Sequence, residues 1–357
     1  MNNFHKETIR VCVLMLCAGI ATADTLYVNN DTAYPAEYRT FDTAFAAAAS
    51  GDTIMLAPST INYGAIVITG KAIKLVGNGT STEHPLLQPK RADLISTLTG
   101  SITIGHDSHS LTGGAPAPNF SPSNGTVITG VRSNGGITVY SDDCVFARYE
   151  TNSTFQIYGD RNVISGCKLA GFAAASRLNP DINSTGTLVR NSLIGSQHVT
   201  SRNNATATLV NCIFGFDTIT LAPTGGGGIF SSFGGVTLRH CVIGANDRFN
   251  GYNGDGARLH HCLIVGDPHY GVPAHSANNG NITTTATTAV FEEGFVLKAD
   301  SPAIAAGEDG EDLGIFGGPT PFEWGGVPAI PLIQKLEILS ANPATGLRFK
   351  VQAVARD

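Results

Sequence analysis

A short apolar strand closed by glycine or a similar turn recurs five times between residues 166 and 266 of this 357-residue chain. The five copies are Gly166–Gly171, Asn191–Gly195, Asn211–Gly215, His240–Gly244 and His261–Gly266. Their central Cys or Ser residues are 25, 20, 29 and 21 positions apart. One such strand cannot bury its inward face alone, so a repeat at this interval predicts a solenoid whose coils pack on one another.

Strand alternation assigns one face of each copy to the core. Every copy runs in the same direction and no hairpin turn separates two copies, so the strands should pair in parallel. We predict an all-β fold, a single-stranded right-handed parallel β-helix of about nine to eleven coils, over residues 24–318. The positions expected to face inward include Cys167, Leu169, Cys212, Phe214, Cys241, Ile243, Cys262 and Ile264.

Both ends of the predicted solenoid carry other elements. Thr40 can cap a helix over Asp42–Ala49, and Gly51 can end it. A helix here is the usual lid on the apolar cross-section that the end of a solenoid exposes. After the coils, a Pro/Gly linker at 319–331 precedes residues 332–357, which should form a β hairpin, cap or tail.

The first 23 residues have the pattern of a secretory signal peptide. Lys6 and Arg10 supply positive charge before an apolar run from Val11 to Ile20. Residues 21–23 form a small-x-small cleavage site. The run is too short to span a bilayer. The sequence therefore predicts a secreted or cell-surface protein, with the periplasm as a further location, and no membrane insertion after signal cleavage.

The charge of the mature chain disfavours two classes of partner. Without residues 1–23, the 22 basic residues fall to 20 and the 28 acidic residues to 27, a formal net charge of −7. This charge and the lack of a basic block argue against nucleic acid and against an anionic membrane. An acidic polysaccharide stays open as a partner, because a local basic groove can lie on an acidic protein.

Five cysteines remain in the mature chain: Cys144, Cys167, Cys212, Cys241 and Cys262. Their number is odd, and four of them lie inside the recurring strand. Free cysteine packs as a small buried hydrophobe, so we favour an inward ladder of Cys and Ser. Export leaves disulfides as an alternative. Zinc is disfavoured because no C-x-x-C pair occurs.

Two segments give the chain a specific resemblance. Residues 41–58 resemble the N-terminal cap and first coil of secreted right-handed parallel β-helix proteins of the pectate-lyase-like superfamily. Leu297–Gly307 and Asp312–Gly318 resemble the last rungs of exported bacterial β-helix proteins, a subgroup without clear activity. The resemblance implies the fold and says little of the activity, since one fold hosts many activities.

The Asp142-Asp143 pair resembles the paired-Asp strand of polygalacturonase-type glycosidases, in which two carboxylates act as acid and base. The other signatures of those enzymes, Asn-Thr-Asp, Gly-His-Gly and Arg-Ile-Lys, are missing. Alignment with the sequence 18 residues further on places Asp160 opposite Asp142 and Arg161 opposite Asp143. We therefore favour a corner ladder of aspartates that cap backbone amides.

Calcium is the one candidate cofactor. Lyase chemistry of this superfamily uses Ca²⁺ held by carboxylates, with an Arg or Lys that removes the proton α to the uronate carboxylate. Asp217, Asp247 and Asp267 each follow a cysteine of the repeat by five or six residues, so they would stack about 4.8 Å apart. Aspartate is also routine in turns, and no other metal or organic cofactor is expected.

Polar side chains are densest between residues 239 and 275, which hold five of the ten histidines. Alternation around Cys241 and Cys262 directs the preceding histidines outward. Arg suits uronate carboxylates, and aromatic faces suit pyranose rings. The catalytic candidates are Arg239, His240, Arg258, His260 and His261, and the ligand-binding candidates are Asp247, Arg248, Tyr252, Asp255, Asp267, His269 and Tyr270. The alternative is a solvated polar face.

Two classes of function stay open. In the first, the chain is an exported β-helix protein that binds extracellular polysaccharide or a cell-surface glycan, with cleavage by a lyase or glycoside hydrolase reaction as an extension. In the second, it is a non-catalytic surface scaffold or adhesin-like protein. The clustered Arg, His, Asp and Tyr favour the first class, and the missing catalytic signatures favour the second.

Overall fold

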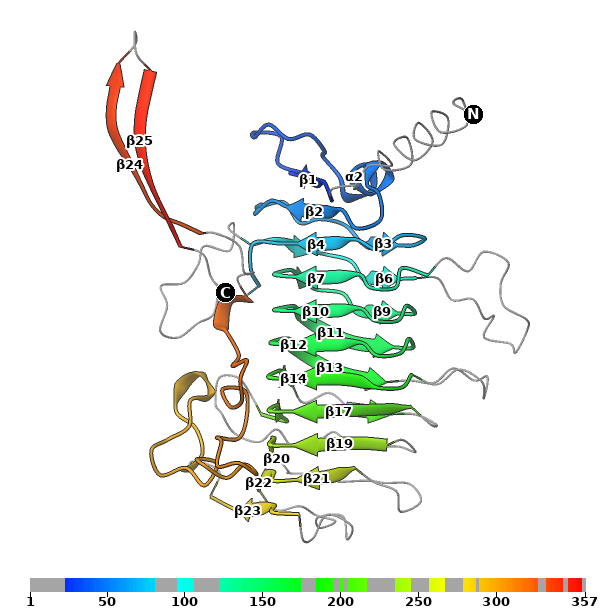
Figure 1. The fold of residues 1–357 in the computed structure, drawn as a ribbon, viewed down its shortest axis with the longest axis vertical. Helices are drawn as coiled ribbons and strands as arrows, with labels where there is room; N and C mark the ends of the chain where they lie inside the picture. Colours follow the sequence, from blue (N-terminus) through cyan, green and yellow to red (C-terminus); the bar gives the residue numbers. More distant parts are fainter. Residues whose placement is uncertain are drawn as a thin grey trace, which may run out of the picture.

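The fold is seen in a computed structural model, which describes residues 23–80, 95–105, 122–174, 184–195, 199–201, 205–216, 235–244, 257–266, 279–286, 289–326, 332–342 and 346–354. Short strands stack in coils along the long axis of the molecule (Figure 1). Within the described residues, no helix has the length and apolar character needed to cross a membrane.

Sheet A forms one side of the coils and contains ten strands. They pair in the order β1 (Thr25–Val28), β2 (Thr53–Leu56), β4 (Lys74–Val76), β7 (Val127–Thr129), β10 (Val145–Ala147), β12 (Val163–Ser165), β14 (Thr187–Arg190), β17 (Thr206–Val210), β19 (Gly235–Arg239) and β21 (Arg258–His260).

Sheet B has 13 strands and two arms. The first arm contains β5 (Thr97–Leu98), β8 (Arg132–Ser133), the start of β11 (Glu150–Ile157), the start of β13 (Lys168–Ala174), β15 (Leu193–Ile194), β18 (Ile213–Phe214), β20 (Val242–Gly244), β22 (Leu263–Val265) and β23 (Ile282–Thr284). The second arm contains β3 (Ile66–Ile68), β6 (Ile102–Ile104), β9 (Ile137–Val139), the ends of β11 and β13, and β16 (Val199–Ser201). The long strands β11 and β13 run through both arms, and their pairing shifts register between Thr151 and Thr154, where one arm ends and the other begins.

Every strand pair in the two sheets is parallel. The strands after Cys241 and Cys262 are direct neighbours, with Val242 opposite Leu263. These observations confirm the predicted all-β parallel β-helix. The ten strands of sheet A agree with the expected number of coils.

The core lies between the sheets and is continuous from β1 to β22. All eight positions predicted to face inward are buried in one apolar cluster. The register of β13, β15, β18, β20 and β22 stacks the residues that precede these strands. This stack is the predicted Cys/Ser ladder, which reads Cys167, Ser192, Cys212, Cys241 and Cys262.

The five described cysteines are free thiols and all are buried. Burial raises the pKa of Cys144 and of Cys167 to about 12. Because a water-soluble reagent does not reach a buried thiol and only the thiolate reacts, we expect the native chain without residues 1–23 to leave all five thiols unmodified by a water-soluble disulfide reagent at mildly alkaline pH. Urea-unfolded protein should react at all five under the same conditions. Stoichiometric reaction of the native protein would contradict the ladder.

The helix α2 (Phe41–Ala47) closes the N-terminal end of the coils, as predicted. The Thr40 hydroxyl accepts a hydrogen bond from the Thr43 amide at 3.3 Å and so caps the helix. Phe41 and Ala44 are buried against the first coils. At the helix C-terminus, the Lys71 ammonium donates to the carbonyl of Ala48 at 2.6 Å.

After β23, the last described parallel strand, residues 289–326 pack on the outside of sheet B; we call this segment the strap. It contains the short 3₁₀ helices η4 (Glu293–Phe295) and η5 (Trp324–Gly326). Outward-facing side chains of sheet B are buried beneath it: Leu193, Ile213, Val242, Leu263 and Val265. The strap residues that cover them include Val290, Phe291, Phe295, Ala303, Leu313, Ile315 and Phe322.

The strap differs from the expectation for this part of the chain. Residues 297–318 were expected to be the last rungs, and they lie outside the coils, beside the first arm of sheet B. Part of the expected linker also belongs to the strap, since Phe322 is buried there. Beyond it, β24 (Leu332–Asn342) and β25 (Gly346–Val354) form an antiparallel hairpin, which is one of the forms expected for this part of the chain.

Candidate functional site

The structure places five of the predicted site residues. Arg239, His240, Arg258, His260 and His261 lie on or beside β19 and β21, at the C-terminal end of sheet A. The other candidates lie outside the described residues: Asp217, Asp247, Arg248, Tyr252, Asp255, Asp267, His269 and Tyr270. Within the described ranges, no group of three His, Cys, Asp or Glu side chains is placed to hold a metal ion. The calcium site therefore stays a prediction.

Arg239, Arg258 and His260 share the outer face of sheet A, and we call them the basic patch. Arg239 is the register partner of His260 in the next strand. Arg258 precedes His260 by two positions, so alternation places both on the same face. The Arg239 side chain is 48% exposed, Arg258 is exposed and His260 is half-buried.

His260 differs in charge from its two neighbours in the patch. Burial lowers the pKa of its imidazole, and the positive charge of Arg239 lowers that pKa further. The ring is therefore neutral at neutral pH and offers one donor and one acceptor. The patch combines two fixed cations with a neutral hydrogen-bonding group.

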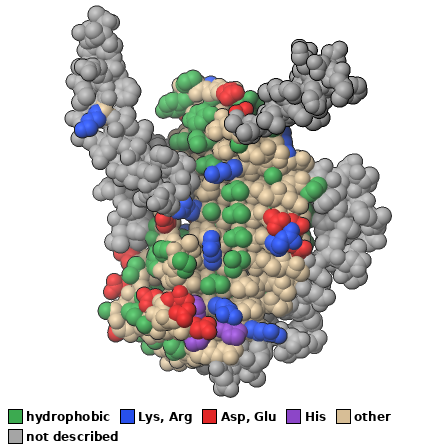
Figure 2. Space-filling view, viewed as in Figure 1, with side chains coloured by type: hydrophobic (Ala, Val, Ile, Leu, Met, Phe, Trp, Pro, Cys, Tyr) green, Lys and Arg blue, Asp and Glu red, His purple; other side chains and the backbone are tan. Residues whose placement is uncertain are grey.

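Figure 2 looks onto this face of the molecule. Hydrophobic side chains form a column along the middle of sheet A, and basic, acidic and His side chains gather at its lower end. The register of sheet A puts Val127, Val145, Val163 and Leu188 in one half-buried column. Charged and His side chains therefore gather at this end of sheet A, and Lys74 and Arg190 lie on the same outer face in earlier coils.

His240 and His261 occupy the corner between sheets A and B and not the face of either sheet. Both have left-handed backbone conformations, with φ of 53° and 47°. Their rings meet edge to face with centroids 6.0 Å apart. The same corner of earlier coils carries Gly130, Arg148, Gly166, Asn191 and Asn211 in this conformation. The left-handed turn directs these side chains away from the core, and those of Arg148, Asn191, Asn211 and His240 contact the strap.

The strap covers His240, which corrects the expectation that this residue lines an open groove. His240 is 9% exposed. Its Nδ1 lies 2.5 Å from the Glu311 carboxylate, and its Nε2 accepts a hydrogen bond from the Glu308 amide at 3.3 Å. An Nε2 that accepts carries no proton, so Nδ1 bears the hydrogen of the neutral ring. His240 is thus a residue that binds the strap.

Two corner asparagines also bind the strap, as donors. The Asn191 amide donates to the carbonyls of Ile315 and Gly317 at 3.0 and 2.7 Å. The Asn211 amide donates to the carbonyl of Asp312 at 3.4 Å. Side chains of three successive coils therefore hold one segment, and the corner has a structural role.

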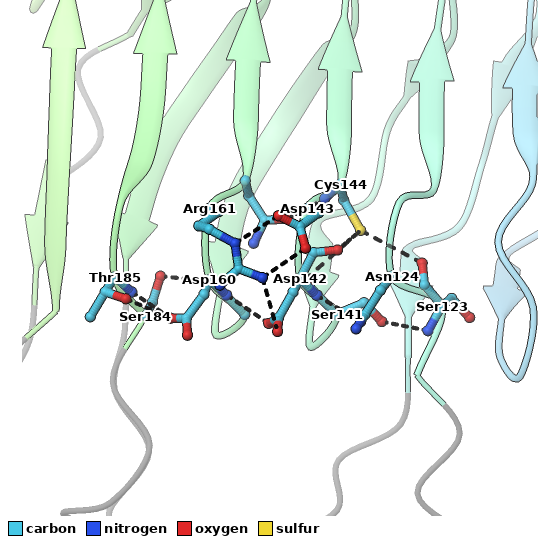
Figure 3. Close-up of polar contacts among 12 residues, drawn as sticks. Ser123, Asn124, Ser141, Asp142, Asp143, Cys144, Asp160, Arg161, Ser184 and Thr185 are labelled. Atoms are coloured by element: carbon cyan, nitrogen blue, oxygen red, sulfur yellow. Dashed lines mark hydrogen bonds and ion pairs between the residues drawn. The ribbon is translucent and has the colours of Figure 1, made fainter.

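The opposite corner of sheet A contains the Asp142-Asp143 pair (Figure 3). Asn124, Asp142 and Asp160 each accept, through Oδ1, a hydrogen bond from a backbone amide of the next coil, at 2.9, 2.8 and 2.7 Å. This is the predicted corner ladder. Asp142 therefore caps a turn of the solenoid.

Asp143 forms a bidentate pair with Arg161. The Arg161 Nε and Nη2 donate to the two carboxylate oxygens at 2.8 and 2.7 Å. This pairing lowers the pKa of Asp143, so the group stays ionised. A carboxylate held in this state is a poor proton donor, and the geometry does not support an acid–base pair of the polygalacturonase type.

No protein-family model matches this chain, and neither a curated protein nor a solved structure matches it. The function of the site is therefore inferred from its own residues. Sequence reasoning missed two of them, Glu308 and Glu311, because they lie in a segment expected to form coils. The acidic turn Glu308-Asp309-Gly310-Glu311-Asp312 was the available signal, since a run this polar does not suit an inward-facing strand.

Proposed function

We propose that the chain is an exported β-helix protein that binds an acidic extracellular polysaccharide at the basic patch. The observation that carries the proposal is the placement of Arg239 and Arg258, exposed on adjacent strands of one open sheet face. The predicted signal segment supports export, and the resemblance to the pectate-lyase-like superfamily supports a carbohydrate ligand.

The chemistry of the patch suits a polymer of uronates. Guanidinium groups form paired hydrogen bonds with planar carboxylates. The neutral His260 adds a donor and an acceptor for sugar hydroxyls. A further arginine, Arg190, stands in the same register column as Arg239, two strands away, which is about 9.6 Å. Cations on more than one coil of the same sheet face suit an anionic polymer better than a single small anion.

Cleavage is the extension of this proposal. Removal of the proton α to a uronate carboxylate needs a base within hydrogen-bond reach and a cation beside the carboxylate. The patch offers cations, and a lyase reaction would use one of its side chains as the base. An assay for unsaturated uronate products and for new reducing ends, with and without Ca²⁺, separates binding from cleavage.

Binding is tested with the double variant Arg239→Ala/Arg258→Ala. We expect affinity for oligomers of galacturonate or mannuronate to fall at least tenfold, because two charge-assisted pairs are lost. The Lys74→Ala variant is the matched control, since Lys74 is exposed on the same sheet face, on β4. Isothermal titration and a glycan array measure both variants.

Unchanged binding in the double variant would contradict the site. If the double variant still binds both acidic and neutral glycans, the binding site lies elsewhere on the solenoid. If the wild-type chain binds no glycan and cleaves none, the proposal fails, and the alternative of a structural scaffold or adhesin-like protein takes its place.

A further inference from the structure

The strap places a carboxylate beside the basic patch. The Glu308 Oε2 lies 3.7 Å from the Arg239 Nη1, and the two side chains are 59% and 48% exposed. The pair bridges the strap and sheet A, which are otherwise joined here through the corner. An acidic ligand that pairs with Arg239 therefore meets a carboxylate already in position.

Hydrogen bonds hold the backbone around Glu308 in place at the corner. The Glu308 amide donates to His240 Nε2 at 3.3 Å. The loop closes on itself through a hydrogen bond from the Gly307 amide to the Glu311 carbonyl at 2.9 Å. The Gly314 amide binds the His240 carbonyl at 2.9 Å. These bonds fix both ends of the acidic turn at the corner next to Arg239.

We propose that Glu308 is a specificity-determining residue that competes with the carboxylates of the glycan for Arg239, an inference that rests on the proposed function. Glu308 weakens the binding of acidic polysaccharide by pairing with Arg239 and by repelling nearby anions. Neutral glycans do not compete for the guanidinium and do not feel the repulsion. The residue thus sets how strongly the patch prefers one charge class of polymer over the other.

The strength of this competition follows from the exposure of the pair. An exposed ion pair contributes about 0.2–1 kcal/mol, which corresponds to a change in affinity of up to about fivefold. The effect should shrink as salt is added, because both the pair and the repulsion are screened. His240 acts as a positioning residue, since it is buried beneath the strap and holds the turn through the Glu308 amide.

The test is the Glu308→Gln variant, which keeps the backbone amide for His240 and removes the charge. Acidic oligosaccharides should bind about two- to fivefold more tightly at low salt, and neutral ones should bind as before. The matched control is Asp309→Asn, because Asp309 is exposed in the same turn and makes the same change in net charge. An equal gain in the control would overturn the inference, since it would show an effect of net charge alone.

A second readout separates this inference from the proposed function. Labelling of Arg239 by an arginine-selective dicarbonyl such as phenylglyoxal, followed by mass spectrometry, reports how accessible the guanidinium is. The rate at Arg239 should rise in Glu308→Gln and not in Asp309→Asn. An unchanged rate overturns the inference even if glycans bind. A raised rate with no glycan bound by any variant overturns the proposed function, and the role of Glu308 in specificity falls with it.

Discussion

Replacement of Phe146 by alanine should lower the free energy of unfolding by about 3–5 kcal/mol. The Phe146 side chain is fully buried in the core between the sheets. Its ring meets that of Phe155 edge to face with centroids 4.8 Å apart, and that of Tyr149 at 6.5 Å. Truncation removes buried apolar surface and leaves a void that the fixed backbone of the neighbouring coils cannot close.

Chemical denaturation measures this loss. The control is Tyr34→Ala, a similar loss of volume at a side chain that is 60% exposed, which should change the stability by less than about 0.5 kcal/mol. A loss below about 1 kcal/mol at Phe146 would mean that the coils collapse around the void. It would also contradict a close-packed core at this level of the solenoid.

Replacement of Ile315 by aspartate should release the strap from sheet B. The Ile315 side chain is fully buried in the second apolar cluster, which the strap forms with the outer face of sheet B. Loss of its buried surface alone costs about 2–5 kcal/mol. The new carboxylate adds the cost of removing a charge from water.

Limited proteolysis followed by mass spectrometry detects the release. Cleavage within 289–326 should become much faster in Ile315→Asp than in the wild-type chain. Ile304→Asp is the matched control, because Ile304 belongs to the same strap and its side chain is 40% exposed. Equal cleavage rates in the two variants would show that the strap is not held by its apolar contact with sheet B.

The coils could be predicted because their signal repeats. Each copy combines period-two alternation with a Cys or Ser that faces inward, and Cys212, Cys241 and Cys262 occupy equivalent places in successive coils. Because the units are alike, few alternative strand pairings between successive coils would keep the apolar positions inside. The helix at Phe41–Ala47 was predictable for a similar reason, since its cap at Thr40 is a local feature.

The strap was not predicted, although the coils beneath it carried a signal. The sheet B strands at Leu193, Ile213, Val242 and Leu263 each begin with two consecutive apolar residues. Two consecutive apolar positions in a strand indicate burial on both faces, whereas the earlier coil at Lys168 has a polar outward position. The pattern therefore indicates that some segment covers the outer face of sheet B, but it does not identify that segment.

The candidate site was predicted in part. The pairing of Arg239 with His260 followed from alignment of the cysteines and is confirmed by the register. The environment of His240 could not be predicted, because it depends on a left-handed corner and on a segment 68 residues away in the sequence. The local alternation of apolar and polar residues does not report contacts between residues so far apart in the sequence.

The course of the strap also determines where the rest of the chain leaves the solenoid. The Gly325 carbonyl accepts a hydrogen bond from the Thr80 amide at 2.9 Å, and Glu323 pairs with Arg148 at 3.2 Å. The chain has then returned to the coil of β4, seven strand spacings from β21 in sheet A, or about 34 Å. A partner attached through the β24–β25 hairpin would therefore be joined to the N-terminal half of the solenoid. The end of the solenoid at β21 would then point away from that partner.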